Sequence, residues 1–449
     1  MSEIASSRGN FSSSLGFVMA AAGSAVGLAN IWGFPSLAAQ NGGAAFLLIY
    51  LLLTFVVGFP LLMAELALGR YARSNPVGTY QKLQGGKPFI PMGFLGIVTV
   101  SLILSFYSIV AGKMTALFLG GFLEFMGMHG LAQWIIQDSI LQKVLFTSLF
   151  FVLTLSIISG GVKNGIEKWS NRFMPSLVLI MILLISYVLT QQGAMDGLKM
   201  YLVPDFNKAF APSLLLDAMG QAFFSLSLAV GGMLVFAGYT NKEDNLLKMG
   251  VMVTLADIGI AFLAGLLIIP AMYVAQSHGS VIYDTNGNLL SGPNLIFQVL
   301  PELFNTFGNF GALVAATFFL LMTLAALTSS IAMLEVPTCY LIDNWQQPRK
   351  KAALGVVVVF WMISMLIVFY EDILFNLVLN ATTKYSQPLL GLSLCLFVGW
   401  VMNRNILINE LVGSDSRLSE SMFISVWPYF VKYVCPIIIL LIFAQVFLN

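Results

Sequence analysis

Two apolar stretches of this sequence carry groups that are able to bind ions or small polar molecules. The first, Ala20–Pro35, reads AAAGSAVGLANIWGFP and places glycine, serine and asparagine inside an apolar run. The second, Gln221–Gly232, reads QAFFSLSLAVGG and again places serine and glycine inside an apolar run. Glycine costs about 1 kcal/mol relative to alanine inside a helix, and lipid penalises every unpaired backbone group. We therefore expect both stretches to unwind, which frees carbonyl oxygens for a cation and amide hydrogens for an anion.

The composition places these stretches in a membrane protein. Hydrophobic residues make up 58% of the 449 residues and charged residues only 9%, whereas soluble domains carry about 25% charged residues. A net charge of +1 gives no reason to expect a nucleic-acid partner. The N-terminus shows no signal-peptide pattern, so the first apolar run is predicted to be a span. Cys339, Cys395 and Cys435 lack the paired spacing of a disulfide framework or metal knuckle.

Hydrophobic run lengths predict an all-α membrane protein with eleven transmembrane helices. A span needs about 20 apolar residues. The candidates begin near Ser14, Ala44, Pro91, Val144, Pro175, Leu214, Met249, Asn309, Lys351, Ile373 and Ser421.

Lysines and arginines between the spans predict the orientation. Those expected on the cytoplasmic side are Arg8, Arg70, Arg73, Lys82, Lys87, Lys163, Lys168, Arg172, Lys242, Lys248, Arg349, Lys350, Lys351, Arg404 and Arg417. Those expected outside are only Lys143, Lys199 and Lys208, while Lys113, Lys384 and Lys432 fall within spans. The N-terminus is therefore predicted inside and, after an odd number of spans, the C-terminus outside.

The two interrupted stretches lie five spans apart, which predicts an internal repeat inverted in the membrane. Matched interruptions in two inverted halves point to the central binding site of a transporter. Small residues that merely pack helices together are the alternative explanation. The predicted parts are a cytoplasmic segment over 1–13, a first five-helix repeat over 14–192, an inverted second repeat over 213–402 and an eleventh helix over 421–448.

Several further motifs resemble those of one family. Together with the two interrupted stretches, the segments NGGAAF, AELALGRY, LSFYSIVAG, LAALTSSIAMLE and FVGW are similar in order to the neurotransmitter:sodium symporter family, which has the bacterial leucine-transporter fold. The resemblance runs from Arg8 to Trp400. It implies a sodium-coupled symporter that imports a neutral, hydrophobic amino acid by alternating access across the cytoplasmic (inner) membrane of a prokaryote.

The resemblance implies two sodium sites. One uses the carbonyls of Gly23, Val26 and Ala325 with the hydroxyls of Thr328 and Ser329. The other uses the Ala25 carbonyl with Asn30, Ser225 and Asp257. Animal relatives place chloride beside the second site, near residue 261. Because Ala261 stands there and Asp257 replaces the usual asparagine, we expect no chloride requirement.

The resemblance also implies how an amino-acid substrate is held. Its carboxylate meets the amides of Leu28 and Ala29 and the Tyr107 hydroxyl. Its amino group meets the carbonyls of Ala25 and Phe224 and the Ser227 hydroxyl. Gly27 favours an amino acid, because monoamine carriers place an aspartate there. The implied side-chain pocket is apolar and is formed by Ile103, Phe224, Val230, Ser329 and Met333.

Two gates are implied as well. Arg8 and Asp343 form the inner gate with Tyr239 and Phe11 nearby, and the buried Glu65 accepts hydrogen bonds from the unwound span six. The outer gate departs from the family pattern, because Gly33 and Leu379 replace its arginine and aspartate.

Two lysines lie within predicted spans and are expected near the outer side of the membrane. Lys113 replaces a usual aromatic residue and is explained by snorkelling to the outer interface. Lys384 lies too deep for that, and we expect it to face the vestibule or a carboxylate.

Other classes of function find less support in the residues. Only His129 and His278 are present, and no phosphate-binding loop, metal motif or nucleophile elbow predicts an enzyme. A channel does not need two broken helices. The rewritten outer gate leaves open a non-transporting amino-acid sensor, or a relative with sodium-independent coupling. The sequence does not indicate the oligomeric state; the expected partners are amino acid, sodium and lipid bilayer.

Overall fold

The protein is a bundle of membrane-length helices. The computed structural model describes residues 9–204, 212–282, 295–307, 310–413 and 421–448, and these residues contain no β-strand. Within them, eight helices are long and apolar enough to cross a membrane, and two bent helix pairs qualify as further spans. These ten correspond to the expected spans, apart from the one beginning near Leu214. That span consists of two helices that are each too short to qualify, so the count of eleven and the inverted repeat stay predictions.

The elements of the first half are α2 (Ser14–Ala25), η1 (Ala29–Gly33), α3 (Phe34–Gln40), α4 (Ala44–Leu53), η2 (Thr54–Gly58), α5 (Phe59–Ala72), α6 (Pro76–Lys82), η3 (Lys87–Phe89), α7 (Ile90–Phe125), α8 (His129–Ile136), α9 (Ile140–Ile158), η4 (Val162–Glu167), α10 (Lys168–Leu189) and α11 (Ala194–Leu202). Those of the second half are α12 (Pro212–Ser225), α13 (Gly232–Ala237), α14 (Leu246–Ser277), η5 (Leu295–Val299), α16 (Leu300–Thr306), α17 (Gly311–Trp345), α18 (Arg349–Phe369), α19 (Glu371–Asn380), η7 (Ala381–Ser386), α20 (Gln387–Leu396), η8 (Phe397–Val401), α21 (Arg404–Val412), α22 (Met422–Tyr429), η10 (Phe430–Val434) and α23 (Cys435–Leu448).

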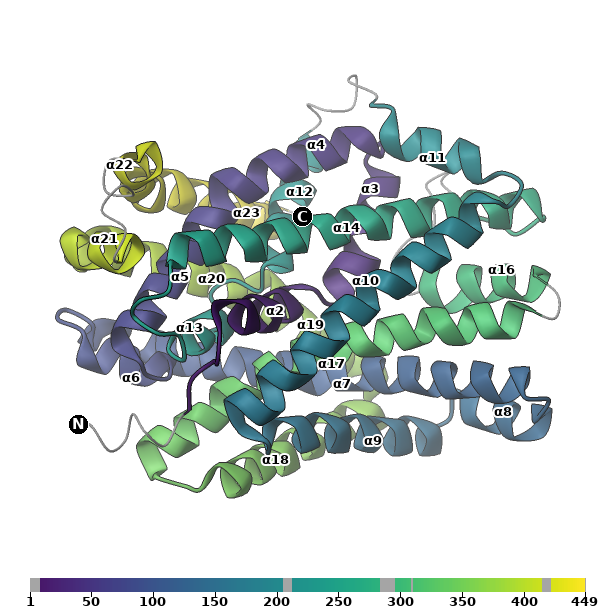
Figure 1. Ribbon diagram of the computed structural model, residues 1–449, viewed down its shortest axis with the longest axis horizontal. Coiled ribbons are helices and arrows are strands. Elements are labelled where there is room, and N and C mark those ends of the chain that lie inside the picture. Colours follow the sequence, from purple (N-terminus) through teal and green to yellow (C-terminus); the bar gives the residue numbers. More distant parts are fainter. Residues whose placement is uncertain (1–8, 205–211, 283–294, 308–309, 414–420, 449) are drawn as a thin grey trace.

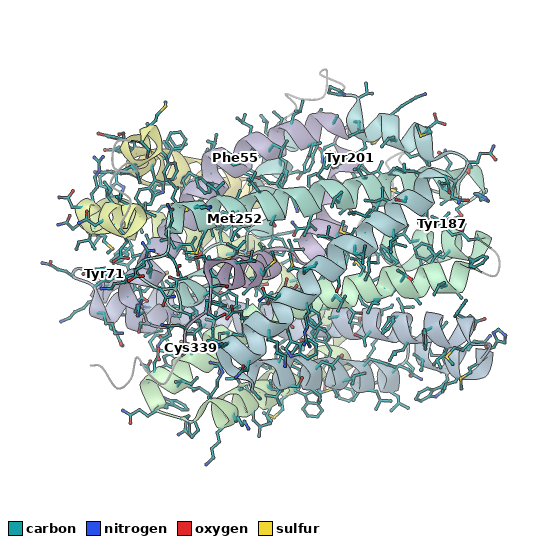
Figure 2. All side chains as sticks on the ribbon, in the orientation of Figure 1. Phe55, Tyr71, Tyr187, Tyr201, Met252 and Cys339 are labelled. Carbon is teal, nitrogen blue, oxygen red and sulfur yellow. The ribbon has the colours of Figure 1, made fainter. Side chains whose placement is uncertain are left out.

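The outer surface of the bundle is apolar. Phe55 on η2, Tyr71 on α5 and Met252 on α14 are exposed large side chains that project from the helices (Figure 2). The surface that faces lipid can expose such side chains, because acyl chains are as apolar as they are. The helices therefore bury polar groups inward, toward the centre of the bundle.

Span one is broken in the middle of this bundle. Helix α2 ends at Ala25, Val26 is extended, and η1 begins at Ala29. The two halves of the span meet at an angle of 53°. Figure 1 shows α2 near the centre, and it packs against α10, α14 and α17. The break thus lies where lipid does not reach, which is the only place where freed backbone groups are tolerated.

Span six is broken in the same manner. Helix α12 ends at Ser225 and α13 begins at Gly232, and the six residues between them form turns. Ser227, Ala229 and Gly231 have positive φ angles of 50°, 64° and 87°. Non-glycine residues rarely adopt this region, so other contacts must hold this segment in place.

A close approach between α5 and α13 fixes the second half of span six. A methyl group at Gly69 of α5 would overlap the backbone carbonyl of Leu234 on α13. Only glycine lets the two backbones lie this close. Gly259 on α14 has nothing within 4 Å of the corresponding methyl position.

We predict that Gly69→Ala lowers the free energy of unfolding by about 1–3 kcal/mol, because overpacking forces the backbones of α5 and α13 apart. Gly259→Ala is the control and should leave stability unchanged or raise it by up to about 1 kcal/mol, as expected for a helical glycine. Chemical unfolding of both variants in detergent measures the difference. Equal stability of the two variants would contradict the packing argument.

Candidate functional site

Five oxygen atoms converge beside the break in span one. The Thr328 hydroxyl lies 2.9 Å from the Ala325 carbonyl and 3.5 Å from the Val26 carbonyl. The Ser329 hydroxyl lies 3.2 Å from the Val26 carbonyl and 3.4 Å from that of Gly23. These are the five groups expected to form one sodium site. Uncharged oxygens suit a hard cation that has to bind and then leave.

The residues expected around the second sodium ion also lie together. Asp257 accepts hydrogen bonds from the Asn30 side-chain amide at 2.7 Å and from the Ser225 hydroxyl at 2.9 Å. The Tyr50 hydroxyl approaches Asp257 at 3.4 Å and was not expected from the sequence. All four side chains are buried. The site therefore contains one carboxylate among neutral oxygens, and Asn30 ties it to the broken span. The Ala25 carbonyl as a further ligand stays a prediction.

A cavity of about 530 Å³ begins at the two breaks. All ten residues expected to contact the substrate line it, and they are Ala25, Leu28, Ala29, Ile103, Tyr107, Phe224, Ser227, Val230, Ser329 and Met333. Four α-helices, η1 and both unwound segments contribute these ten residues to one lining. Near the breaks the lining combines an apolar wall with polar groups of the backbone and hydroxyls, which is the usual character of a small-molecule site.

The polar end of the cavity lies at Gly27 and Tyr107. The Tyr107 hydroxyl is close to the Leu28 backbone and the Ser329 hydroxyl, yet it makes no standard hydrogen bond to any described residue. A methyl group at Gly27 would lie 2.5 Å from the Ser329 hydroxyl and 3.2 Å from the Tyr107 hydroxyl. A buried hydroxyl without a partner favours a ligand that supplies one, and a carboxylate is a strong acceptor.

Glu65 supports the unwound segment of span six. Its buried carboxylate accepts hydrogen bonds from the backbone amides of Ala229 at 3.0 Å and Gly231 at 3.1 Å. The Ser227 hydroxyl donates to the Ser24 carbonyl at 3.2 Å, which joins the two broken spans directly. These bonds hold the left-handed residues of span six in place.

The cavity is sealed toward the end where the chain begins. Phe11 and Tyr239 are buried there, and the Tyr239 hydroxyl donates to Glu335 at 2.6 Å. Glu335 also forms an ion pair with Arg349 at 2.5 Å. Neither Glu335 nor Arg349 was expected from the sequence as part of the inner gate.

The expected inner ion pair is described from one side only. Asp343 accepts hydrogen bonds from the backbone and side chain of Asn75, at 3.1 Å and 2.7 Å. Arg8 lies outside the described residues, as do Lys208 and Arg417. The Arg8–Asp343 pairing therefore stays a prediction.

At the opposite end the cavity reaches the surface through a chain of charges. Lys143 lies 2.5 Å from Glu371 and 3.6 Å from Asp138, which in turn lies 3.5 Å from Lys113. The Lys113 ammonium also sits 4.6 Å above the ring of Phe297. The Asp138 and Glu371 side chains are 57% and 41% exposed, so this charged rim, defined as these four ionised residues, marks the mouth of the cavity.

The structure bears on two expectations about lysines. Lys384 is exposed and is absent from the cavity lining, so its expected place facing the vestibule or a carboxylate stays a prediction. Lys113 faces the cavity mouth rather than lipid, so snorkelling does not explain it.

A helical stripe was the signal that sequence reasoning missed. Glu371, Phe375 and Leu379 follow one another at intervals of four residues on α19, and all three line the cavity. The Glu335–Arg349 pair carried no such signal, because an ion pair between two helices leaves no local pattern in the sequence. Gly33 and Leu379, which replace the family's outer ion pair, both line the cavity.

Comparisons with known proteins agree on one family. The model of the sodium:neurotransmitter symporter family matches residues 8–126 and 123–449. The "Uncharacterized sodium-dependent transporter YhdH" of Bacillus subtilis is 32% identical, and the alignment covers 97% of each chain. The human sodium- and chloride-dependent GABA transporter 2 is 26% identical over 80% of this chain and 67% of its own length.

One solved structure is similar along its whole length. The crystal structure of MhsT in complex with L-phenylalanine matches with a TM-score of 0.82 and 33% identity. The match covers 97% of this chain and 99% of that chain.

Proposed function

Because the chain belongs to the sodium:neurotransmitter symporter family, a family of multi-pass sodium-dependent transporters and not of enzymes, we propose that it imports a neutral, hydrophobic amino acid. Import would be driven by sodium through alternating access. The observation that carries the proposal is the cavity between two broken helices, with one oxygen cluster at its edge and another beside it. The membrane would be that of a prokaryotic cell, with the N-terminus inside.

Two sodium ions would bind in the oxygen clusters beside span one. The cluster of Gly23, Val26, Ala325, Thr328 and Ser329 joins α2 to α17, so an ion there would hold the broken span against a long helix. The cluster around Asp257 joins span one to α12 and α14. Each ion would thus stabilise one arrangement of helices. Sodium entering an inside-negative cell contributes about 2.3 kcal/mol per charge per 100 mV.

The substrate would be an amino acid with an apolar side chain. Its carboxylate would meet the Leu28 and Ala29 amides and the Tyr107 hydroxyl, which has no other standard partner among the described residues. Its amino group would meet Ser227 and nearby carbonyls. Ile103, Val230 and Met333 line the remaining space without a charge. MhsT, the similar solved structure, binds L-phenylalanine, which supports a large hydrophobic side chain here as well.

Asp257 would supply the negative charge that chloride supplies in some relatives. Ala261 lies one helical turn beyond it on α14 and offers no hydroxyl to an anion. A carboxylate fixed in the protein removes the need for a diffusible anion such as chloride. Transport would then require sodium but not chloride.

The charged rim would hold span ten over the cavity mouth. Glu371 on α19 is tied to Lys143 on α9, and the same face of α19 presents Phe375 and Leu379 to the cavity. The family's usual ion pair is absent at Gly33 and Leu379. Ion pairs with residues of other helices, such as Lys143 with Glu371, would therefore hold the outer half of span ten in place.

The first test of the proposal is a ligand screen. Purified protein would be melted with each of the twenty amino acids, in sodium and in potassium buffer. We expect stabilisation by hydrophobic amino acids in sodium only, because a ligand that binds the folded state raises its stability. Uptake into vesicles with and without a sodium gradient then separates a transporter from a sensor. Binding without uptake would favour the sensor, and sodium-independent uptake would overturn the coupling.

We predict that Thr328→Ala combined with Ser329→Ala abolishes sodium-driven uptake, because the first cluster loses both of its hydroxyls. Thr323→Ala on the same helix is the control, since its hydroxyl bonds only to the Phe319 carbonyl in the structure described here. Uptake and sodium-dependent thermal stabilisation are both measured. Unchanged sodium dependence in a folded double variant would refute the site.

We predict that replacing chloride by gluconate leaves uptake unchanged, because Asp257 already supplies the negative charge. Asp257→Asn should abolish uptake, and combining it with Ala261→Ser should restore an uptake that responds to chloride. Uptake at fixed sodium and varied chloride measures both effects. A strong chloride requirement of the unmodified protein would overturn this assignment.

We predict that Glu371→Gln weakens apparent substrate affinity by about two- to fivefold, because an exposed ion pair contributes about 0–1 kcal/mol. Asp196→Asn, an exposed acid on α11 that does not line the cavity, is the control. Substrate titrations of the purified, sodium-loaded proteins give the two affinities. If both variants bind like the unmodified protein, the rim has no role in holding span ten.

A further inference from the structure

A second cavity lies far from the two breaks, where span ten ends. It has a volume of about 320 Å³ and lies between η8, α21, α22 and η10. The chain bends there by 105° between span ten and α21. Figure 1 shows α21 and α22 side by side at the end of the bundle that also carries α6. This end carries Arg70, Arg73 and Lys82, which by the positive-inside rule marks the cytoplasmic side.

Two cations line this cavity, and neither has a carboxylate partner among the described residues. The Lys432 ammonium lies 4.4 Å above the Trp400 ring and 5.5 Å from the ring of Tyr433. The Arg404 guanidinium lies 5.5 Å from the ring of Tyr429. Aromatic faces hold these cations in place without neutralising them. The net charge of the lining is therefore positive, since Lys432 and Arg404 are its only ionisable acids or bases besides tyrosine.

Hydrogen bonds and a close helix contact order the walls around the two cations. The Trp400 indole donates to the Lys432 carbonyl at 3.2 Å, and the buried Trp427 indole donates to the Pro60 carbonyl at 2.9 Å. A methyl group at Gly399 would lie 2.8 Å from the Lys432 Cα, so glycine permits the close approach of span eleven to span ten. These contacts fix both sides of the cavity.

The surroundings match the headgroup region of a bilayer. Trp400, Tyr429 and Tyr433 are large exposed aromatic residues, and tryptophan and tyrosine gather where acyl chains meet headgroups. Lys432 belongs to a span, yet its long side chain reaches this level. A positive cavity between spans on the cytoplasmic side favours the phosphate of an anionic lipid, and arginine matches phosphate oxygens in a bidentate manner.

We propose that this cavity binds the phosphate of an anionic phospholipid from the cytoplasmic leaflet, with Arg404 and Lys432 as its ligands. The headgroup would close the junction of spans ten and eleven while the acyl chains lie along the apolar surface of span eleven. Free phosphate has the same chemistry but lacks the acyl chains.

Native mass spectrometry of the full-length protein tests the proposal. The protein is released from detergent with phosphatidylglycerol, with phosphatidylcholine or with inorganic phosphate. We expect retained phosphatidylglycerol, little phosphatidylcholine and no effect of inorganic phosphate. Arg404→Gln with Lys432→Gln should weaken phosphatidylglycerol binding about 25-fold, which is about fivefold for each cation near an anionic surface.

The matched control is Arg172→Gln. Arg172 also lies 5.5 Å from an aromatic ring, that of Trp169, but it does not line this cavity. It should retain lipid like the unmodified protein. If Lys432→Gln impairs folding, Arg404→Gln alone should still lower binding about fivefold, because Arg404 is exposed. Three results would each overturn the proposal. They are an equal loss of phosphatidylglycerol binding in the control, equal retention of phosphatidylglycerol and phosphatidylcholine, and binding of inorganic phosphate in place of the lipid.

Discussion

The carboxylate of Glu65 is the group on which the centre of the molecule depends. It is buried, so it needs donors, and the unwinding of span six leaves amide hydrogens that need an acceptor. The bonds from Ala229 and Gly231 satisfy both needs at once. They also hold the left-handed turns that aim the Ser227 hydroxyl at the Ser24 carbonyl. One side chain of span two thus holds the unwound segment of span six in the position from which it bonds to span one.

The two ends of the bundle are closed by different physical means. At the sealed end, Phe11 and Tyr239 are buried, and Glu335 is completely enclosed between Tyr239 and Arg349. Opening that end exposes apolar surface and separates a buried pair, which is costly because it leaves a charge without its partner. At the open end the charged rim is hydrated, and hydrated pairs are weak. The sealed end is therefore expected to set the larger energetic barrier.

Hydropathy predicted an all-helical membrane bundle and glycine predicted the two breaks, whereas the cavity residues came from the family resemblance. The structure brings all of those cavity residues to one lining. Reasoning from the sequence failed where two residues far apart in the chain come into contact. Tyr50 reaches Asp257, and Lys143 reaches Glu371, across more than 200 residues.

Ser329 belongs to two environments at the same time. Its hydroxyl approaches the carbonyls of Gly23 and Val26, and the residue also lines the cavity. An ion on the carbonyl side and a ligand in the cavity would therefore share this residue as a contact. Thermodynamic reciprocity then applies: the factor by which the ion raises the ligand's affinity must equal the factor by which the ligand raises the ion's. Ser329 is thus a residue through which the two occupants would be coupled.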